Sequence, residues 1–417
     1  MPAAPVIGAV IDFTPGISIL VNPLTLDDPY YGQLGFGQLA TAGTNYVEIT
    51  NIIKEAHIRR GRSRILSKFE AGTAIVEIYD QNGDWNPDNP ASPYYGDLIP
   101  LRKIQIFADY NGTRYYLFTG FITNYITNFA LGTDDVSRVT FKCVDAFKLF
   151  NGALITTVSG ATAGQLSGTR VTKILDEIAY PSGLRDIDAG DTTLQADPGT
   201  SRNALEALRT VEDSELGGFY IDAEGRATFL SRSVITQSLG NVAYTFADNG
   251  SGIAYQGASV NLDVDILLND VNVQRLGGTT QNAFDQTSID TYFTHSGVRQ
   301  DVLMETDSVA LSMAQMILST RSDVETRIDS ITLNLENGTD VARCQAGLNL
   351  ELLNAVTVTK TMPGASSVTQ TLLVQGLNHD FTNKTITTTV YTGESLVAGF
   401  LLNSASQGII GTNHLSY

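Results

Sequence analysis

Hydrophobic and polar residues alternate with a period of two over much of the first third of the chain, which predicts β-strands with one buried face. β-Branched residues are frequent in these stretches, as between Thr73 and Tyr79. Asn111-Gly112 predicts a tight hairpin between two of them, and Asn82-Gly83 carries the same signal. The expected strands are 46–49, 53–59, 71–79, 102–110, 113–125 and 137–144. We therefore predict an antiparallel β-barrel or sandwich over residues 45–155.

After this unit the period changes to that of a helix. Apolar residues recur at the spacing of one helix face, at Val171, Ile174, Leu175 and Ile178. Pro181 then ends the predicted helix 170–180. A second helix is expected over 202–214 with Ser201 as its N-cap, followed by a hairpin over 219–230 that turns at Gly225. These elements predict an inserted α+β domain at residues 156–238.

Short strand patterns return beyond the insert. Residues 239–324 are interpreted as connecting β segments and a helix, with strands at 242–246, 258–262 and 271–275 and the helix from 308 to 320 with Asp307 as its cap. A second β unit is predicted over residues 325–400, with strands at 327–335, 355–361, 368–378 and 384–391 and a short helix at 340–347. The two ends differ from the rest of the chain. Residues 1–44 are expected to be an arm with one short strand at 6–11, and residues 401–417 an apolar tail.

Charge narrows the classes of function. The chain has 44 acidic and 26 basic residues, a net charge of −18. Such a field repels phosphate groups, whereas a protein that grips a nucleic-acid backbone needs the opposite sign. It would suit a channel through which DNA passes without sticking. The start of the chain has no signal-peptide pattern, no window of about 20 apolar residues predicts a membrane span, and the two cysteines do not form a disulfide or metal framework.

The densest positive charge lies between two expected strands, from the end of strand 53–59 to just before strand 71–79. Five basic side chains occur within ten residues, at Arg59, Arg60, Arg62, Arg64 and Lys68. They could bind phosphate, but the acidic remainder of the chain favours pairing with carboxylates of a neighbouring subunit. The loop after the next strand carries the only tryptophan, Trp85, together with Tyr94 and Tyr95. We predict that these eight residues form a subunit interface.

No motif in the chain predicts catalysis or a cofactor. Oxygen-bearing side chains alternate in the loop, at Asp80, Asn82, Asp84, Asn86 and Asp88. A calcium loop of the EF-hand type needs Gly at its sixth position and Glu at its twelfth, where this chain has Trp85 and Ala91. Walker, Gly-x-Ser-x-Gly and His-Glu-x-x-His patterns are absent. We therefore predict a polar loop in place of a metal site, no cofactor and no enzymatic activity.

Six stretches of the chain are informative as a set: Ile58-Arg-Arg-Gly-Arg-Ser-Arg64, Phe69-Glu-Ala-Gly-Thr-Ala74, Pro93-Tyr-Tyr-Gly96, Leu117-Phe-Thr-Gly-Phe121, residues 212–229 and Val374-Gln-Gly-Leu-Asn-His-Asp380. Together they resemble minor tail proteins, or tail hub proteins, of long-tailed (siphovirus-type) phages of actinobacteria. The resemblance covers roughly residues 45–400. It implies a baseplate-hub-like fold that is mainly β with an α+β insert, in which two tail-tube-like antiparallel β-barrels accompany a small helix-hairpin domain.

The resemblance also implies a virion structural protein of the tail tip, made in the host cytoplasm. Three copies would form a homotrimeric hub ring that continues the tail tube and provides the DNA ejection channel. Implied partners are the distal tail protein, the tape measure protein and other tail-tip proteins, with genomic DNA passing through the lumen without specific binding. Two alternatives stay open: a hexameric distal tail protein, and a receptor- or carbohydrate-binding tail-tip module suggested by the loop at 79–96.

Overall fold

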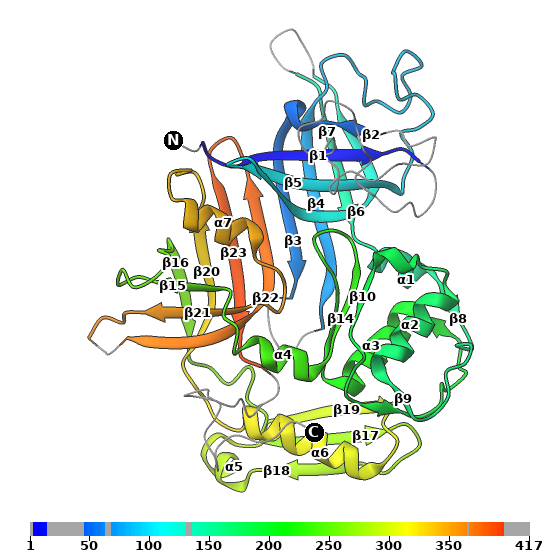
Figure 1. Cartoon of the computed structure of the whole chain (residues 1–417), viewed down its shortest axis with the longest axis vertical. Coiled ribbons are helices and arrows are strands. Elements are labelled where there is room, and N and C mark those ends of the chain that lie inside the picture. Colours follow the sequence, from blue (N-terminus) through cyan, green and yellow to red (C-terminus); the bar gives the residue numbers. More distant parts are fainter. Residues whose placement is uncertain (1–2, 15–45, 63–67, 131–135, 365–366, 396–417) are drawn as a thin grey trace.

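The computed structural model describes residues 3–14, 46–62, 68–130, 136–364 and 367–395. In the view of Figure 1, strands of the two β units fill the top and left, the helical insert lies to the right, and a small helix-covered sheet lies at the bottom. Most regular structure is strand, so the predicted mainly β class with an α+β insert is confirmed.

The first β unit follows the predicted alternation closely. Its strands are β1 (Val6–Asp12), β2 (Tyr46–Glu48), β3 (Ile53–Gly61), β4 (Glu70–Tyr79), β5 (Arg102–Tyr110), β6 (Thr113–Asn128) and β7 (Arg138–Val144), with a 3-10 turn at Thr50–Ile52. They are arranged in the order β3-β4-β7-β6-β5-β1-β2. Asn111 and Gly112 have φ values of 49° and 79° and turn β5 into β6, as predicted.

Two expectations for this unit are wrong. Asn82-Gly83 does not make a hairpin, because β4 pairs with β3 and β7 and not with the strand that follows it. The short strand expected at 6–11 is confirmed as β1, but it does not belong to an arm, because β1 pairs with β5 along its whole length and buries Ala9 and Ile11 completely. The remainder of the predicted arm, from residue 15 to residue 44, lies outside the described residues, as does the predicted tail.

The second β unit draws its strands from two separate parts of the sequence. Its elements are β15 (Tyr244–Ala247), β16 (Gly257–Asn261), β20 (Arg327–Asn334), α7 (Val341–Asn349), β21 (Ala355–Lys360), β22 (Val368–Phe381) and β23 (Ile386–Gly393). They run β16-β20-β23-β22, while β21 pairs with β22 and with β15. The strands predicted after residue 325 are confirmed, and β15 and β16, which reach this sheet from the segment interpreted as a connection, confirm the strands expected at 242–246 and 258–262.

The two β units are joined edge to edge. Strand β22 pairs antiparallel with β3, so all of these strands form one 13-stranded sheet. Figure 1 shows β22 and β3 side by side at the centre of the molecule. One hydrophobic cluster extends under both units, from Ile11 to Val390. The expectation of two separate barrels is corrected: among the described strands no barrel closes, and the sheet runs from edge strand β16 to edge strand β2.

The insert is the predicted helix-hairpin domain with additional short strands. It contains α1 (Phe147–Gly152), β8 (Leu154–Ile155), β9 (Gln165–Leu166), α2 (Ser167–Glu177), a 3-10 turn (Ser182–Leu184), β10 (Arg185–Ile187), β11 (Thr193–Leu194), β12 (Arg202–Asn203), α3 (Ala204–Glu215), β13 (Gly218–Ile221), β14 (Ala227–Leu230) and α4 (Arg232–Ser238). Asn203 caps α3 by accepting the Glu206 N–H at 2.7 Å, so the expected cap at Ser201 is wrong by two residues.

A third, unexpected unit lies at the bottom of Figure 1. It consists of β17 (Asp270–Arg275), β18 (Gln281–Phe284), α5 (Gln286–Tyr292), β19 (Ser296–Val302) and α6 (Asp307–Arg321). Helix α6 covers one face of the β18-β17-β19 sheet and shares a hydrophobic core with it. Thr306, not Asp307, is its N-cap. The strand expected at 271–275 and the helix expected at 308–320 are confirmed as β17 and α6, and with β18, α5 and β19 they form a packed unit of their own.

Candidate functional site

The junction between the two β units is the place where the most distant parts of the sequence meet. Six residues of β22 pair with six of β3, from Gly376 opposite Gly61 to Phe381 opposite Ala56. On the exposed side of this junction, His57 Nδ1 and Asp380 Oδ1 lie 2.6 Å apart. Because sheet hydrogen bonds and a cross-strand polar pair both link the strands here, the junction fixes the two units in one orientation.

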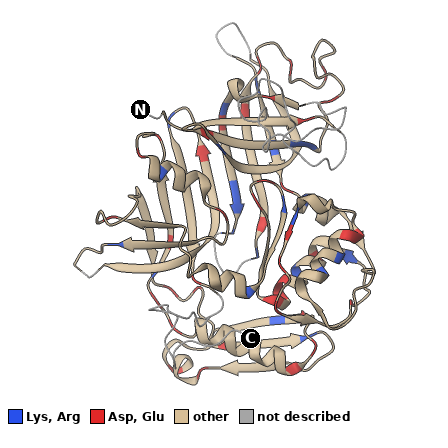
Figure 2. Cartoon of the chain, viewed as in Figure 1, with Lys and Arg blue, Asp and Glu red and all other residues tan. Residues whose placement is uncertain are grey.

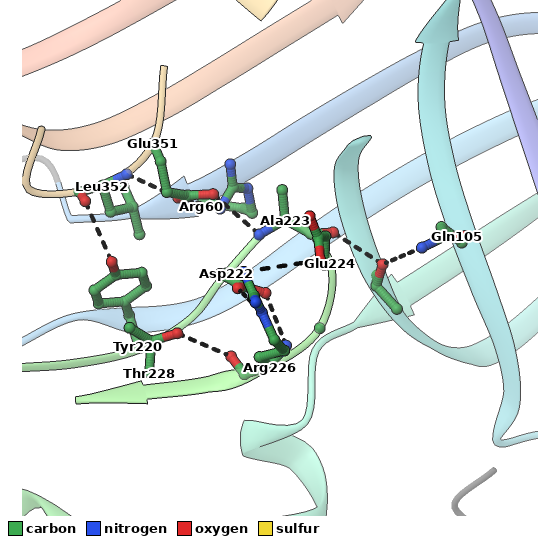
Figure 3. Close-up of polar contacts among 12 residues, drawn as sticks. Arg60, Gln105, Tyr220, Asp222, Ala223, Glu224, Arg226, Thr228, Glu351 and Leu352 are labelled. Carbon is green, nitrogen blue, oxygen red and sulfur yellow. Dashed lines mark hydrogen bonds and ion pairs between the residues drawn. The ribbon is translucent and has the colours of Figure 1, made fainter. Parts of the chain in front are cut away.

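A second ion pair joins a buried arginine to a glutamate whose side chain is 26% exposed. Arg60 on β3 is only 4% exposed, and its Nη1 atom lies 2.6 Å from Glu351 Oε1. Glu351 precedes β21, and its other carboxylate oxygen accepts the backbone N–H of Ala223 at 3.1 Å. Figure 3 shows this carboxylate between the guanidinium and the insert. A single side chain thereby holds the first β unit, the second β unit and the insert together.

The tip of the β13–β14 hairpin completes this contact. Thr119 on β6 donates its hydroxyl to the Ala223 carbonyl at 2.9 Å, and Tyr220 donates to the Leu352 carbonyl at 3.3 Å (Figure 3). Gly225 turns the hairpin at φ +88° and lies so close to Thr119 that an added Cβ would come within 2.7 Å of its methyl group. Only glycine fits both the backbone angle and the space.

Burial controls the electrostatics around this junction. It raises the pKa of Asp222, whose carboxylate also accepts the Arg226 N–H groups of the same hairpin. Burial raises the pKa of Asp145 to about 7, against the lowering effect of N–H groups from Gly72 and Phe147. The pKa of His379, buried in β22, falls to about 3 for the same reason. Each of these groups is engaged in structural hydrogen bonds, the imidazole with the Thr388 hydroxyl at 3.0 Å.

The structure separates the eight predicted interface residues into different settings. Arg59 is half-exposed and lies 3.2 Å from Glu70. Arg62 is nearly buried, donates to Gln375 Oε1 at 2.8 Å and stacks 4.3 Å above the Phe69 ring. Lys68 pairs at 2.6 Å with Asp213 of the insert.

The carboxylate that meets Arg60 therefore belongs to its own chain, and the expectation that a neighbour supplies it is corrected for this residue. Burial is the physical reason, since a guanidinium in the core must find its partner there. Arg64 lies outside the described residues.

The aromatic residues of the loop are likewise placed within the chain. Trp85 is 4% exposed and packs against Phe13, Tyr94 and Phe141. The ring centroids of Trp85 and Tyr94 lie 4.7 Å apart. Tyr95 is 57% exposed. Trp85 and Tyr94 thus hold the loop onto the first β unit, whereas Tyr95 keeps the exposure that a subunit contact requires. An interface role for Tyr95 and Arg59 stays a prediction.

The polar loop has the local bonding of a turn. Asp80 accepts the Trp85 N–H at 3.3 Å, and Asn89 Nδ2 donates to the Gly83 carbonyl at 2.8 Å. In the described part of the chain, no group of three or more His, Cys, Asp or Glu side chains is arranged to hold a metal ion. Nor is any described helix both long and apolar enough to cross a membrane.

Sequence reasoning missed Glu351, the partner of Arg60, and the hairpin tip that this glutamate contacts. The alternation within β3 did contain a signal, because Arg60 falls on the same side as Ala56 and Ile58, the buried side. A basic residue on the buried face of a strand needs a buried acidic partner. Nothing local identifies that partner, which lies 291 residues further on.

The fold was compared with those of known proteins. No family model matches the chain, and no curated protein matches it. Two solved structures match over most of their length. The tail protein from Neisseria meningitidis MC58 aligns with a TM-score of 0.52 and 11% identity, covering 84% of this chain and 94% of that one. The 43 kDa tail protein of prophage MuSo2 from Shewanella oneidensis aligns with a TM-score of 0.53 and 13% identity, covering 84% and 96%.

The chain therefore has the fold of phage tail proteins. At these identities the likeness concerns the fold, and it extends across both β units, since it covers most of the chain. The resemblance to tail proteins noted in the sequence is confirmed at this level. Its narrower form, a relation to long-tailed phages of actinobacteria, stays a prediction.

Proposed function

We propose that this protein is a structural component of a phage tail, located in the virion at the tail tip, and that three copies form the hub ring there. The observation that carries the proposal is the pairing of β22 with β3, which gives each copy two β units in one rigid sheet. Three such copies would supply six units around a ring. The shared fold with two phage tail proteins supports the same reading.

Ring closure would use the sheet edges. Strand β16 has a partner on one side only, β20, and β2 ends the described sheet on the other side. Unpaired edges invite pairing with another chain. Contacts between two unlike edges of identical copies generate a closed ring when the rotation fits. The edge at β16 of one copy would therefore face the first β unit of the next.

The exposed face of the joined sheet would line the channel. Across the junction one register row reads Thr332, Thr389, Asn378, Arg59 and Thr73. Near this row Arg59 is paired with Glu70 of the same chain, and Asp380 lies within hydrogen-bond distance of His57. Both signs of charge occur on the large sheet (Figure 2). Hydroxyl and amide groups without excess positive charge would let genomic DNA pass without specific binding.

The remaining parts of the proposal follow from a ring at this position. Its partners would be the distal tail protein above it, the tape measure protein and other tail-tip proteins. Its role would be assembly and passage of DNA, without enzymatic activity, cofactor or membrane span. Self-association is the step that can be measured first, because the other partners bind the assembled ring.

Mass photometry of the purified chain, followed by cryo-EM of the particles, tests the proposal. We expect a species of about three times the 44.9 kDa of one chain, with pseudo-sixfold density from six β units. A sixfold ring of six chains would instead establish the distal-tail alternative. A hub ring would be contradicted if the purified chain stays a monomer at every concentration and isolated tails show no ring of this protein.

A further inference from the structure

The small sheet at the bottom of Figure 1 has one face covered by α6 and one face open. Side chains of alternate residues point to the open face. In register there, Asp270 lies between Phe284 on β18 and Ser296 on β19. In the next open row, Asn272 lies between Asn282 and Val298. We call these six residues the open face.

The polar groups of the open face are held by one another. Asn282 donates to Asp270 Oδ1 at 2.6 Å and to Asn272 Oδ1 at 3.0 Å. Ser296 donates its hydroxyl to Asp270 Oδ2 at 2.7 Å. The hydrogen bonds from Ser296 and Asn282 lower the pKa of Asp270, which stays a carboxylate. The amides and the carboxylate are therefore oriented before any ligand arrives, which reduces the entropy cost of binding.

Apolar side chains flank these polar groups. Phe284 is 57% exposed and Val298 is 62% exposed, each at the end of a row. A third apolar side chain, Phe293, is 83% exposed just before β19.

Phe293 is held in place by a buried residue. It has φ 62° and ψ 175°, a conformation that costs a non-glycine residue energy. Asn269, fully buried, stabilises it by donating to the Phe293 carbonyl at 2.8 Å and accepting the His295 N–H at 2.7 Å. Two phenyl rings thus lie exposed at the same end of the sheet.

We propose that the open face binds a neutral oligosaccharide. Sugar hydroxyls both donate and accept, which matches a carboxylate beside two amides. The C–H face of a sugar ring is apolar and packs on an exposed phenyl ring, whose face is negative. The pattern of a few fixed polar groups with aromatic neighbours is that of a small-ligand site.

Other occupants fit the open face less well. The cores of protein interfaces are depleted in Asp and Ser, two of its central residues. A phosphate-bearing ligand would be repelled by Asp270. The surrounding segment adds to that repulsion, because residues 239–324 contain ten acidic and three basic side chains. The site lies away from the β3–β22 junction, so the inference goes beyond the proposed ring and does not depend on it.

Isothermal titration of the full chain with purified neutral glucan, galactan and mannan hexasaccharides tests the inference. We expect at least one of them to bind, and Phe284→Ala and Asn282→Ala each to weaken that binding about tenfold or more. Phe129→Ala is the matched control, because Phe129 is 64% exposed but lies after β6 in the first β unit. That variant should bind like the unmodified chain.

Absence of binding by all three probes at millimolar concentration would overturn the inference, as would equal binding by Phe284→Ala and the unmodified chain. Mass photometry of the same variants separates this outcome from the ring proposal. Intact assembly with lost sugar binding supports the site, and a failure to assemble in the unmodified chain bears on the ring alone. Binding of a protein ligand with unchanged affinity in Asn282→Ala would also contradict a sugar site.

Discussion

Two polar clusters of this molecule use similar residues in opposite settings. Around Arg60 and Glu351 the cluster is largely buried, since Arg60 is 4% exposed and the Glu351 side chain 26%, and its members come from three distant parts of the chain. Around Asp270 the cluster is open, and its members lie within a single 33-residue unit from β17 to β19. The buried cluster explains how the β units are held together, whereas the open one is free to meet a ligand. The presence of charged side chains does not distinguish a cluster that holds the fold together from one that can meet a ligand, whereas the extent of burial does.

The strongest test of the buried cluster is removal of its acid. In Glu351→Ala the Arg60 guanidinium keeps its buried position and loses its partner. We expect a loss of about 3–5 kcal/mol in the free energy of unfolding, the usual cost of an uncompensated buried charge. Urea denaturation measures it. Glu70→Ala is the control, since its partner Arg59 is half-exposed, and it should cost less than about 1 kcal/mol. Equal losses in the two variants would remove the distinction between buried and exposed pairs.

A second test uses His379, which lies beside the junction on β22. Its folded-state pKa of about 3 is below the value of an unfolded histidine, so the unfolded chain binds a proton more readily between those values. The stability it contributes is complete above pH 6.5 and is lost as the pH falls toward 3. We expect this loss to reach roughly 4 kcal/mol.

Comparison with His379→Gln isolates this residue. Asp145 has a raised pKa and acts in the opposite direction, favouring the folded state as the pH falls below about 7, but it does so in both proteins. The difference in unfolding free energy between them should therefore shrink from pH 7 to pH 4. A difference that is constant with pH would show that His379 is not buried in neutral form.

The hairpin tip gives a smaller effect. Gly225→Ala forces a Cβ toward Thr119 at an unfavourable φ, and we expect it to cost about 1–3 kcal/mol. Thermal unfolding followed by circular dichroism is sufficient. Gly112→Ala is the matched control, with a similar φ of 79° but open space around it, so its cost should be strain alone. If the two variants unfold together, the contact with Thr119 has no energetic weight.

Local pattern predicted the elements well and their assembly poorly. The alternation in β3 to β7 located each strand to within a few residues, because burial of one face is written into adjacent positions. The pairing of β22 with β3 is non-local and has no such trace in either strand. In the helix-covered sheet, the pattern predicted β17 and α6, but it did not predict β18 and β19, because the β17–β18 hairpin has no Asn-Gly signal and both of its strands are short.

The candidate site shows the same limit. A run of basic residues predicted one interface, yet Arg60, Arg62 and Lys68 each bind within the chain. Their partners, Glu351, Gln375 and Asp213, are spread over two other regions, so sequence proximity grouped residues that the fold separates. Trp85 was predicted to lie in a subunit interface, whereas it packs into the core of its own chain, as its size favours.

The central claim is that Arg60 and Glu351 act as one unit that locks the two β units together. A double-mutant cycle with Arg60→Met and Glu351→Gln tests it directly, because glutamine can still accept the Ala223 N–H. We predict that Glu351→Gln costs about 3 kcal/mol when Arg60 is present and less than about 1 kcal/mol in the Arg60→Met background. Equal costs in both backgrounds would show that the two side chains act independently, and would contradict the claim.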